Sequence, residues 1–359
     1  MNPVLFLLIS GLTIVVAATH ATKGCSSIEI RKEWRALSKA QRKSWIDAVN
    51  CLGKLPRSGK LKPPVNTSET GQPFDIIAPV TQNSTYYDDL VYAHMNLNPL
   101  IHLTGLFLPW HRLYVHQWTN TLRTQCGYKG VAPYWAWEKD VADFEHTAIW
   151  DIDSKSGLGG FGDPQDDFTV KTGALDLTLA YPIVHKLRRE YRPYPGFRGI
   201  ANISANSTFT QQEVNTLLNT QDGNFTAFQS YMEGFLGMHT AVHAIVGGDL
   251  AGLCPKGSAN TSLCPVSGAP TFSANEPIFH LHHGNIDRLW WLWQEKGPKN
   301  KQAFRGGSVQ NISAIVEFPN GQPPWLHKTN VIPAAGMYES YTIGEVMDTR
   351  KWPLCYEYK

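Results

Sequence analysis

The stretch "FLPWHRLYVHQW", residues 107–118, predicts a helix with a histidine on its inner face. Proline is favoured in the first turn of a helix, so we expect this helix to begin at Pro109. Residues at the spacing i, i+4, i+7 and i+11 share one helical face, and here they are His111, Val115, Trp118 and Leu122. Three of these four are apolar, so the face points into the core and His111 points there with them.

Other segments also carry helix patterns. A capping box at Ser38 and Gln41 precedes apolar residues at helical spacing. Residues 86–96 are compatible with a helix, and residues 225–248 and 275–297 each predict a helix that ends at glycine. The remainder of the chain is rich in glycine, proline and scattered aromatic residues. We therefore expect one domain with a helical core wrapped by irregular chain.

The composition is that of a folded globular protein. The chain has 359 residues, of which 42% are hydrophobic and 17% are charged, and its formal net charge is +2. A charge so close to zero provides no electrostatic footprint for nucleic acid or for an anionic membrane, so neither is expected as a partner. No later stretch approaches the ~20 consecutive apolar residues of a membrane-spanning helix.

The N-terminal segment predicts secretion. An apolar run from Val4 to Ala18 is followed by small residues that offer cleavage after Ala18 or Ala21. We interpret residues 1–18 as a signal peptide and residues 22–359 as a single extracellular domain. Six cysteines fit an oxidising compartment, and six can pair in 15 ways. Seven Asn-x-Ser/Thr sequons agree with secretion: Asn66, Asn83, Asn202, Asn206, Asn224, Asn260 and Asn311.

The histidines fall into two groups along the chain. His94, His102 and His111 follow one another at intervals of 8 and 9 residues. In the second group His239 and His243 are four residues apart, and the adjacent His282 and His283 come later. An i, i+4 pair places two imidazoles on one helical face, where they can bind one metal ion. Each group therefore has enough imidazoles to hold an ion.

A single histidine is more often a core or surface residue than a ligand. Six histidines are interpreted in that way: His20, His116, His146, His185, His280 and His327. An i, i+4 histidine pair is also found in zinc sites, and all-imidazole ligation suits copper, zinc, iron or nickel. A ligating histidine usually donates its second N–H to a partner. We expect Asp287, four residues after His283, to be such a partner.

The sequence resembles the tyrosinase, catechol oxidase and hemocyanin family of dinuclear copper proteins, in particular the short secreted fungal polyphenol oxidases. The resemblance runs over nearly the whole chain after residue 30. Its motifs are "RKEWRALS" (31–38), "FLPWHR" (107–112), "CGYKGVAPYWAWEKD" (126–140), "HTAVHAIVGG" (239–248), "EPIFHLHHGNIDRLWWLWQ" (276–294) and "LCYEY" (354–358).

The resemblance implies a mainly α fold, in which a central four-helix bundle holds a dinuclear copper site and is wrapped by long irregular loops with few short strands. His94, His102 and His111 would bind copper A. His239, His243 and His283 would bind copper B. His282 would lie beside these ligands without binding the ion.

The implied activity is the oxidation of o-diphenols (catechols) to o-quinones, with two copper ions per chain and O2 as co-substrate. Small phenols would be the substrates, and the oligomeric state stays open. Relatives with a C-terminal lid domain continue well past the Tyr-x-Tyr signature, so we expect residues 22–359 to form the catalytic domain without that lid. By the same resemblance, we expect the disulfides Cys25–Cys355, Cys51–Cys126 and Cys254–Cys264.

Several positions depart from the family pattern. Many tyrosinases have Asn directly after the first copper-B histidine, where Asn and a nearby Glu orient a water that deprotonates monophenols. Here Thr240 occupies that position, Ala244 after His243 offers no polar group, and Glu233 is the counterpart of the Glu, with a surface or salt-bridge role as the alternative. The candidate catalytic residues are thus Glu233, Thr240, Ala244 and His282.

These departures predict efficient oxidation of o-diphenols and weak hydroxylation of monophenols, with a full tyrosinase as the alternative. Leu100 stands where many relatives have a Cys joined to the following copper-A histidine, so that cross-link is absent.

Other classes account for less of the sequence. A hemocyanin-type oxygen carrier would use the same histidines but has a covering domain. A zinc hydrolase needs one histidine triad and a general base, which leaves the second triad unexplained. A laccase-type oxidase needs several His-x-His pairs, of which this chain has one. A non-catalytic secreted binding module would lack the near-ultraviolet absorbance of the oxygenated dinuclear copper site.

Overall fold

Helices dominate the part of the chain that a computed structural model describes, residues 24–62, 77, 80–195, 203–258, 264 and 270–359. The predicted signal peptide and its cleavage sites lie outside these residues. The helices are α1 (Lys39–Leu52), α2 (Tyr86–Ile101), α3 (Phe107–Cys126), α4 (Ala205–Thr208), α5 (Gln211–Leu218), α6 (Phe225–Glu233), α7 (Met238–Val246), α8 (Ile278–Glu295) and α9 (Pro298–Gln302). The predicted mainly α fold is confirmed.

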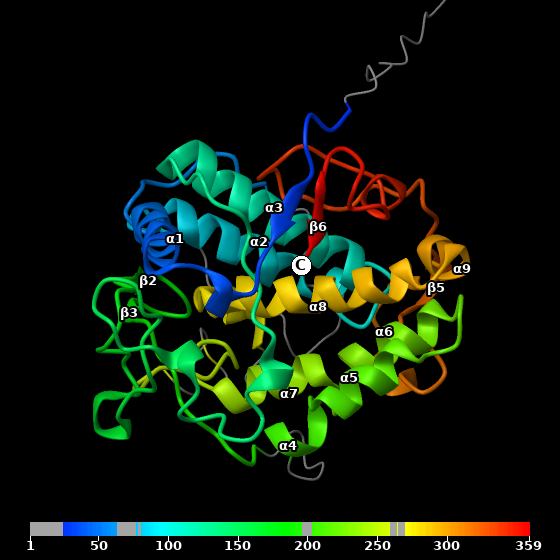
Figure 1. The fold of residues 1–359 in the computed structure, drawn as a ribbon. Helices are drawn as coiled ribbons and strands as arrows, with labels where there is room; N and C mark the ends of the chain where they lie inside the picture. Colours follow the sequence, from blue (N-terminus) through cyan, green and yellow to red (C-terminus); the bar gives the residue numbers. More distant parts are fainter. Residues whose placement is uncertain (1–23, 63–76, 78–79, 196–202, 259–263, 265–269) are drawn as a thin grey trace, which may run out of the picture.

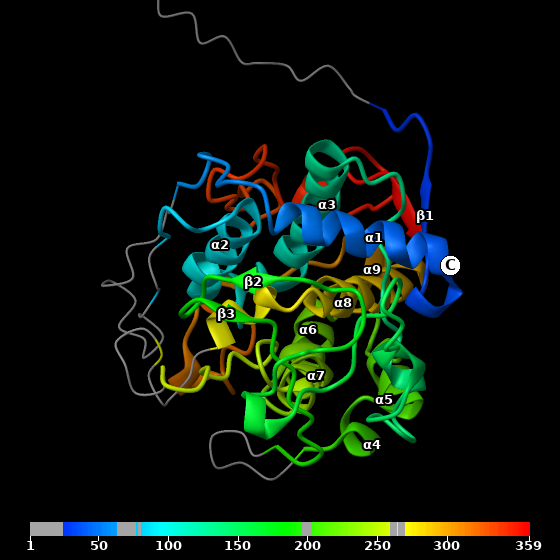
Figure 2. The same cartoon turned by 90° about the vertical axis from the view of Figure 1, so that its left-hand side faces the viewer.

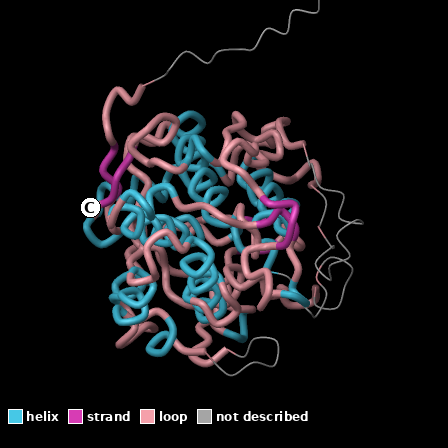
Figure 3. Tube along the Cα trace, turned by 90° about the vertical axis from the view of Figure 1, so that its right-hand side faces the viewer, coloured by secondary structure: helices cyan, strands magenta, loops and turns pink. Residues whose placement is uncertain are grey.

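Short strands lie at the margins of the helical core (Figure 3). They are β1 (Glu29–Arg31), β2 (Thr178–Leu179), β3 (His185–Lys186), β4 (Gly307–Val309), β5 (Gln322–Trp325) and β6 (Tyr356–Tyr358). β2 and β3 pair antiparallel, as do β4 and β5, whereas β1 and β6 pair in parallel. The strands therefore fasten loops and chain ends and build no sheet that could serve as a core.

Helix α8 lies across the middle of the molecule, with α2 and α3 on one side and α6 and α7 on the other (Figures 1 and 2). α1 packs against α3, and α3 packs against α8. Large aromatic side chains fill these contacts, among them Trp45, Trp118 and Trp290, each no more than 1% exposed. Burying side chains of this size is the main stabilising contribution to such a core.

Two predicted helix starts can be compared with the structure. The capping box of α1 is confirmed, because Ser38 Oγ accepts from the Gln41 N–H (3.3 Å) and Gln41 Oε1 accepts from the Ser38 N–H (2.9 Å). The predicted start of α3 at Pro109 is wrong by two residues, since α3 begins at Phe107. Proline is tolerated there because the first N–H groups of a helix need no intrahelical partner. His111 is buried as predicted.

The single helix expected over residues 225–248 is wrong, because α6 and α7 are separate helices. Gly234 and Gly237 flank the break, and a Cβ at Gly237 would lie 2.6 Å from the Met232 carbonyl oxygen. Glycine thus allows the chain to turn closely on itself between the two helices. The break places Glu233 at the end of α6 and His239 in the first turn of α7.

A buried ionic cluster joins both chain ends to the helical core. Asp287 on α8 accepts hydrogen bonds from Arg112 on α3 and from the hydroxyl groups of Tyr356 and Tyr358 on β6. Arg31 on β1 lies 3.5 Å from the same carboxylate, and its guanidinium stacks on the Tyr356 ring. A carboxylate held by two buried cations and two hydroxyl groups has its hydrogen-bonding capacity filled.

Two disulfides join distant parts of the chain, and a third closes a short loop. The predicted pairs Cys25–Cys355, Cys51–Cys126 and Cys254–Cys264 are all confirmed. The first reinforces the pairing of β1 with β6. The second joins α1 to the end of α3.

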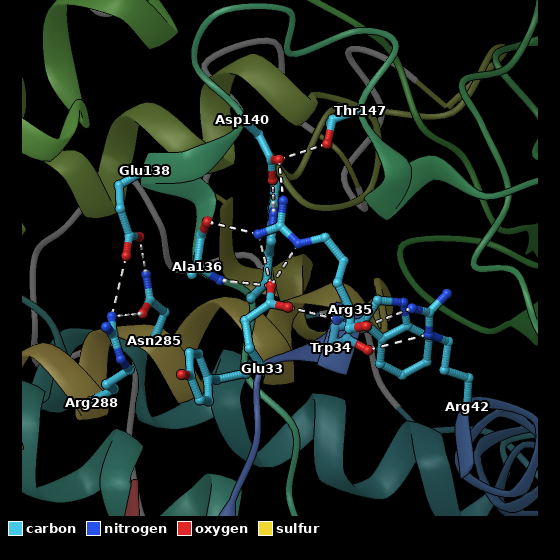
Figure 4. Close-up of polar contacts among 12 residues, drawn as sticks. Glu33, Trp34, Arg35, Arg42, Ala136, Glu138, Asp140, Thr147, Asn285 and Arg288 are labelled. Atoms are coloured by element: carbon cyan, nitrogen blue, oxygen red, sulfur yellow. Dashed lines mark hydrogen bonds and ion pairs between the residues drawn. The ribbon is translucent and has the colours of Figure 1, made fainter. Parts of the chain in front are cut away.

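Residues 133–140 contact α8 and fix its position (Figure 4). Glu138 accepts hydrogen bonds from Asn285 (3.0 Å) and Arg288 (3.2 Å) on α8. Gly284 lies where this segment crosses the helix, and a Cβ there would be 2.9 Å from the Pro133 carbonyl oxygen. This close crossing is adjacent to His283 and holds that part of α8 in place.

Within the described residues, no helix has the length and apolar character needed to span a membrane.

Candidate metal centre

The structure gathers the predicted histidines into two groups. In the α2/α3 group, the ligand atoms of His94, His102 and His111 all lie within 4.8 Å of one another. The α7/α8 group meets the same criterion and contains His239, His243, His282 and His283. Residues nearly 190 positions apart in the sequence are thus brought into two clusters of imidazoles by four helices.

The two groups face each other. The rings of His111 and His283 stack with centroids 4.1 Å apart and an interplanar angle of 10°. His102 and His239 form a second contact between the groups, at 6.0 Å. Phe279 packs against both groups, with its ring 4.2 Å from that of His283 and 5.0 Å from that of His94. The geometry is that of one bipartite site.

Burial keeps these imidazoles neutral. It lowers the pKa of His102, His111, His239 and His283 well below the usual value of 6.5, and the neighbouring imidazoles lower it further. Burial also lowers the pKa of His243 to about 4. A neutral imidazole has a lone pair that can bind a metal ion. His102 is the partly exposed member of the set and therefore lies on the accessible side of the site.

Backbone carbonyl groups, not carboxylates, orient the rings. Nδ1 of His111 lies 2.8 Å from the Phe107 carbonyl oxygen, and Nδ1 of His243 lies 2.7 Å from that of Leu250. The expectation that Asp287 orients His283 is wrong, because Arg112, Tyr356 and Tyr358 occupy the oxygens of Asp287. The sequence predicts that Asp287 lies one turn after His283, but it does not predict the residues that bind the Asp287 carboxylate instead.

The oriented rings leave nitrogen atoms with unused lone pairs. A carbonyl at Nδ1 fixes the proton there, so Nε2 is left as an acceptor. Nε2 of His111 and Nε2 of His243 are both buried and have no hydrogen-bond partner among the described residues. Buried polar atoms are nearly always satisfied in proteins. Such atoms in both groups, surrounded by other imidazoles, fit a metal ion bound in each group, and copper is among the metals that imidazole suits.

Glu233 and Thr240 occupy positions close to the site, although neither belongs to a histidine group. Glu233 is 3% exposed, and its carboxyl accepts from the Leu103 N–H (2.5 Å) and from Gln229 Nε2 (3.1 Å). Burial raises the pKa of Glu233 well above 4.5. A surface role for Glu233 is therefore wrong. Thr240 Oγ1 donates to the Gly234 carbonyl oxygen at the end of α6 (3.2 Å).

Ala244 and His282 complete the set of sequence candidates. Ala244 is buried on α7 beside His243 and has no polar side-chain atom. His282 is fully buried, and its ring lies 4.9 Å from that of His243 and 5.4 Å from that of His239. The structure thus places four imidazoles in the α7/α8 group where three were expected as ligands.

Sequence reasoning missed the residues that hold the turn after His102. Gln229 Nε2 donates to the Thr104 carbonyl oxygen (2.7 Å), and Gln310 Nε2 donates to the His102 carbonyl oxygen (3.0 Å). The i, i+4 spacing of Gln229 and Glu233 is a signal that these two share a face of one helix. No local signal connects Gln310 to His102, because 208 positions separate them.

The remaining histidines lie outside both groups, except that His20 is outside the described residues. His185 pairs with Asp249 (2.9 Å), and exposed His146 pairs with Asp143 (2.8 Å). His280 is buried and stacks on Trp118 with centroids 3.6 Å apart. His116 is buried against Tyr356, and His327 lies in a surface loop.

Comparisons with known proteins agree with this geometry. A family model described as the common central domain of tyrosinase matches residues 84–296. The tyrosinase-like protein phomQ1 of Diaporthe leptostromiformis is 31% identical over 95% of this chain and 80% of its own. The N-acetyl-6-hydroxytryptophan oxidase ivoB of Emericella nidulans is 28% identical over 92% of both chains. A solved polyphenol oxidase from Thermothelomyces thermophila shares the fold, with a TM-score of 0.61 at 24% identity over 92% of this chain and 89% of its own.

Proposed function

Since the chain belongs to the tyrosinase family of dinuclear copper proteins, we propose that it is a copper-dependent oxidase that converts o-diphenols to o-quinones with O2 as co-substrate. The paired histidine groups carry this proposal. Two facing sets of neutral, buried imidazoles fit two metal ions that act on one small substrate.

In this proposal each group holds one copper ion. His94, His102 and His111 bind copper A, and His239, His243 and His283 bind copper B. His282 packs beside the copper B ligands. Bound copper supplies the redox chemistry, by which two diphenols lose two electrons and two protons each while one O2 is reduced to two waters.

The residues of the chain prepare the site for this chemistry. The Phe107 and Leu250 carbonyl groups orient His111 and His243, so that Nε2 of each ring faces the site. Phe107 and Phe279 pack between the rings and exclude water from that side. The partial exposure of His102 marks the side from which a phenol enters.

We propose further that monophenol hydroxylation is weak. Thr240 replaces the Asn of many relatives, and its hydroxyl group already donates to the Gly234 carbonyl oxygen. Ala244 contributes no polar atom, so Glu233 is left as the one polar candidate among these positions. A diphenol gives up electrons without being hydroxylated first, and it does not depend on a water oriented in this way.

Oxygen uptake by the copper-loaded protein tests both parts. The substrates are a matched pair, 4-methylcatechol and 4-methylphenol, and the control is the same protein loaded with zinc. We expect rapid uptake with the catechol, slow uptake with the phenol and none with the zinc form. No uptake with the catechol at full copper loading would overturn the proposed oxidase. Equal rates with the two substrates would make the protein a full tyrosinase.

A zinc hydrolase would use one histidine group and leave the other unexplained. Secretion is also part of the proposal, and the three disulfides support it because such bonds persist in oxidising compartments. Small phenols are the proposed partners.

A further inference from the structure

The turn that follows His102 is held by side chains from elsewhere in the fold. One backbone group of each of residues 102, 103 and 104 meets a buried or nearly buried polar side chain. The His102 carbonyl oxygen accepts from Gln310 Nε2 (3.0 Å), and the Leu103 N–H donates to Glu233 Oε1 (2.5 Å). The Thr104 carbonyl oxygen accepts from Gln229 Nε2 (2.7 Å). We call Gln229, Glu233 and Gln310 the His102 clamp.

The turn needs such support because local structure does not fix it. α2 ends at Ile101, and His102 is already extended, with φ −124° and ψ 141°. Leu103 has φ +52°, in the left-handed region that side chains other than glycine rarely adopt. The ring of His102 is only loosely tied to its own helix, since Nδ1 lies 3.4 Å from the Asn98 carbonyl oxygen. Nδ1 of His111 lies closer to its own helix, 2.8 Å from the Phe107 carbonyl oxygen, and Nδ1 of His243 lies 2.7 Å from the Leu250 carbonyl oxygen beyond the end of α7.

The clamp is itself rigid. Gln229 and Glu233 lie one turn apart on α6, and Gln229 Nε2 also donates to Glu233 Oε2 (3.1 Å). Gln229 is fully buried and Glu233 is 3% exposed. Gln310 reaches the turn from the loop after β4. Two separate parts of the fold therefore hold the turn from either side of the Leu103 N–H.

We propose that the His102 clamp positions His102 as a ligand and so sets the copper affinity of the α2/α3 group. This inference rests on the proposed function, because it assigns metal binding to that group. Gln229, Glu233 and Gln310 are positioning residues that act through the backbone of residues 102–104. Outer residues that orient a ligand typically change metal affinity by about 10- to 100-fold when they are removed.

The alternative is that the clamp only stabilises the fold. A purely structural clamp would lower stability without distinguishing the two histidine groups. The decisive measurement is therefore the copper affinity of each group by itself. A His239→Ala/His243→Ala background retains the α2/α3 triad, and a His94→Ala/His111→Ala background retains the α7/α8 group.

Each background receives Glu233→Leu or Gln310→Leu, and Cu(I) affinity is measured by competition with a chromophoric chelator. We expect a loss of about 10-fold or more in the α2/α3 background and less than about 3-fold in the α7/α8 background. Glu233→Gln keeps an acceptor for the Leu103 N–H and should retain most of the affinity. Gln310→Leu carries the test if Glu233→Leu does not fold by circular dichroism.

Asn300→Leu is the matched control. Asn300 is a fully buried amide that accepts from the Gly223 N–H (2.7 Å) and donates to the Trp293 carbonyl oxygen (2.9 Å), and within the described part of the chain none of its hydrogen bonds reaches a histidine of either group. It should change neither affinity by more than about 3-fold. Equal losses in both backgrounds, no loss in either, or the same loss in Asn300→Leu would overturn the positioning role. If the unsubstituted protein binds copper in neither group, the proposed function fails instead.

Discussion

The α7/α8 histidines and the α2/α3 histidines are built in different ways. His239, His243 and His283 all lie within helices, so helical geometry sets the direction in which each side chain leaves the backbone. His102 lies beyond the last residue of α2, and side chains 130 and 208 positions away hold its turn. Helical register directs each of these α7/α8 side chains once the two helices have packed, whereas His102 needs in addition the long-range contacts that hold its turn.

Removing one ligand from either group should produce the largest effect. His111→Ala and His243→Ala are each expected to reduce diphenol oxidation to background, because both ions must act on one substrate. Copper content should fall from about two ions per chain to about one, since in each variant one of the two ions loses one of its three imidazoles. Oxygen uptake and copper analysis measure these effects, with circular dichroism as the control for folding. Full turnover in either variant would contradict the ligand assignment.

The next effect concerns the ionic cluster that joins the two groups. Arg112 follows His111 on α3, and Asp287 lies one turn after His283 on α8. Asp287→Ala leaves the guanidinium groups of Arg112 and Arg31 buried without their carboxylate. Removing one partner of a buried ion pair costs about 3–5 kcal/mol, so we expect a loss of that size in the free energy of unfolding.

Denaturant unfolding of the metal-free protein measures this loss. Asp47→Ala is the control, because Asp47 forms an exposed pair with Lys43 on α1, and such pairs contribute about 1 kcal/mol or less. Similar losses in the two variants would show that the cluster does not stabilise the contact between α3 and α8.

The same contrast explains how much of the structure was predictable. The spacing of His239 and His243 and the inward face of His111 are local properties of helices, and the structure places all three as expected. The break between α6 and α7 was missed because the close approach of Gly237 to Met232 depends on the turn itself. The partners of Asp287 come from β1, α3 and β6, so no local sequence pattern predicts them. The contact between Gln310 and His102 could not be predicted either, because the two residues are 208 positions apart.

A smaller effect is expected within the α7/α8 group, at the residue after His239. Thr240→Asn introduces a carboxamide that can orient a water together with Glu233. General-base catalysis typically contributes about 10²- to 10⁴-fold, and restoring part of it should raise the ratio of monophenol to diphenol rates by about 10-fold. Initial rates for both substrates at equal copper loading measure the ratio. Thr240→Val, which removes the hydroxyl group and adds no amide, is the control. An unchanged ratio in Thr240→Asn would show that position 240 does not control the subclass.

The smallest effect concerns the loop that orients the His243 ring. Nδ1 of this ring has its hydrogen-bond acceptor beyond the end of α7. Leu250 provides that acceptor, and the neighbouring Asp249 pairs with His185. Burial lowers the pKa of His185, but the Asp249 carboxylate outweighs burial and the repulsion from Arg188, and the net pKa is raised above 6.5.

A raised pKa in the folded state means that protonated His185 contributes stability below about pH 6.5, and that this contribution is lost as the pH rises through the folded pKa. His185→Asn should therefore be less stable than the wild type at pH 5.5, and the difference between the two proteins should narrow by pH 9. The other buried histidines destabilise both proteins equally in acid, so the difference in melting temperature isolates His185. A difference that stays constant or grows between pH 5.5 and 9 would show that the charge of His185 does not hold Asp249. In that case the hydrogen bonds between Asp249 and the backbone of Arg188 would position Leu250, and with it the His243 ring, without a charge on His185.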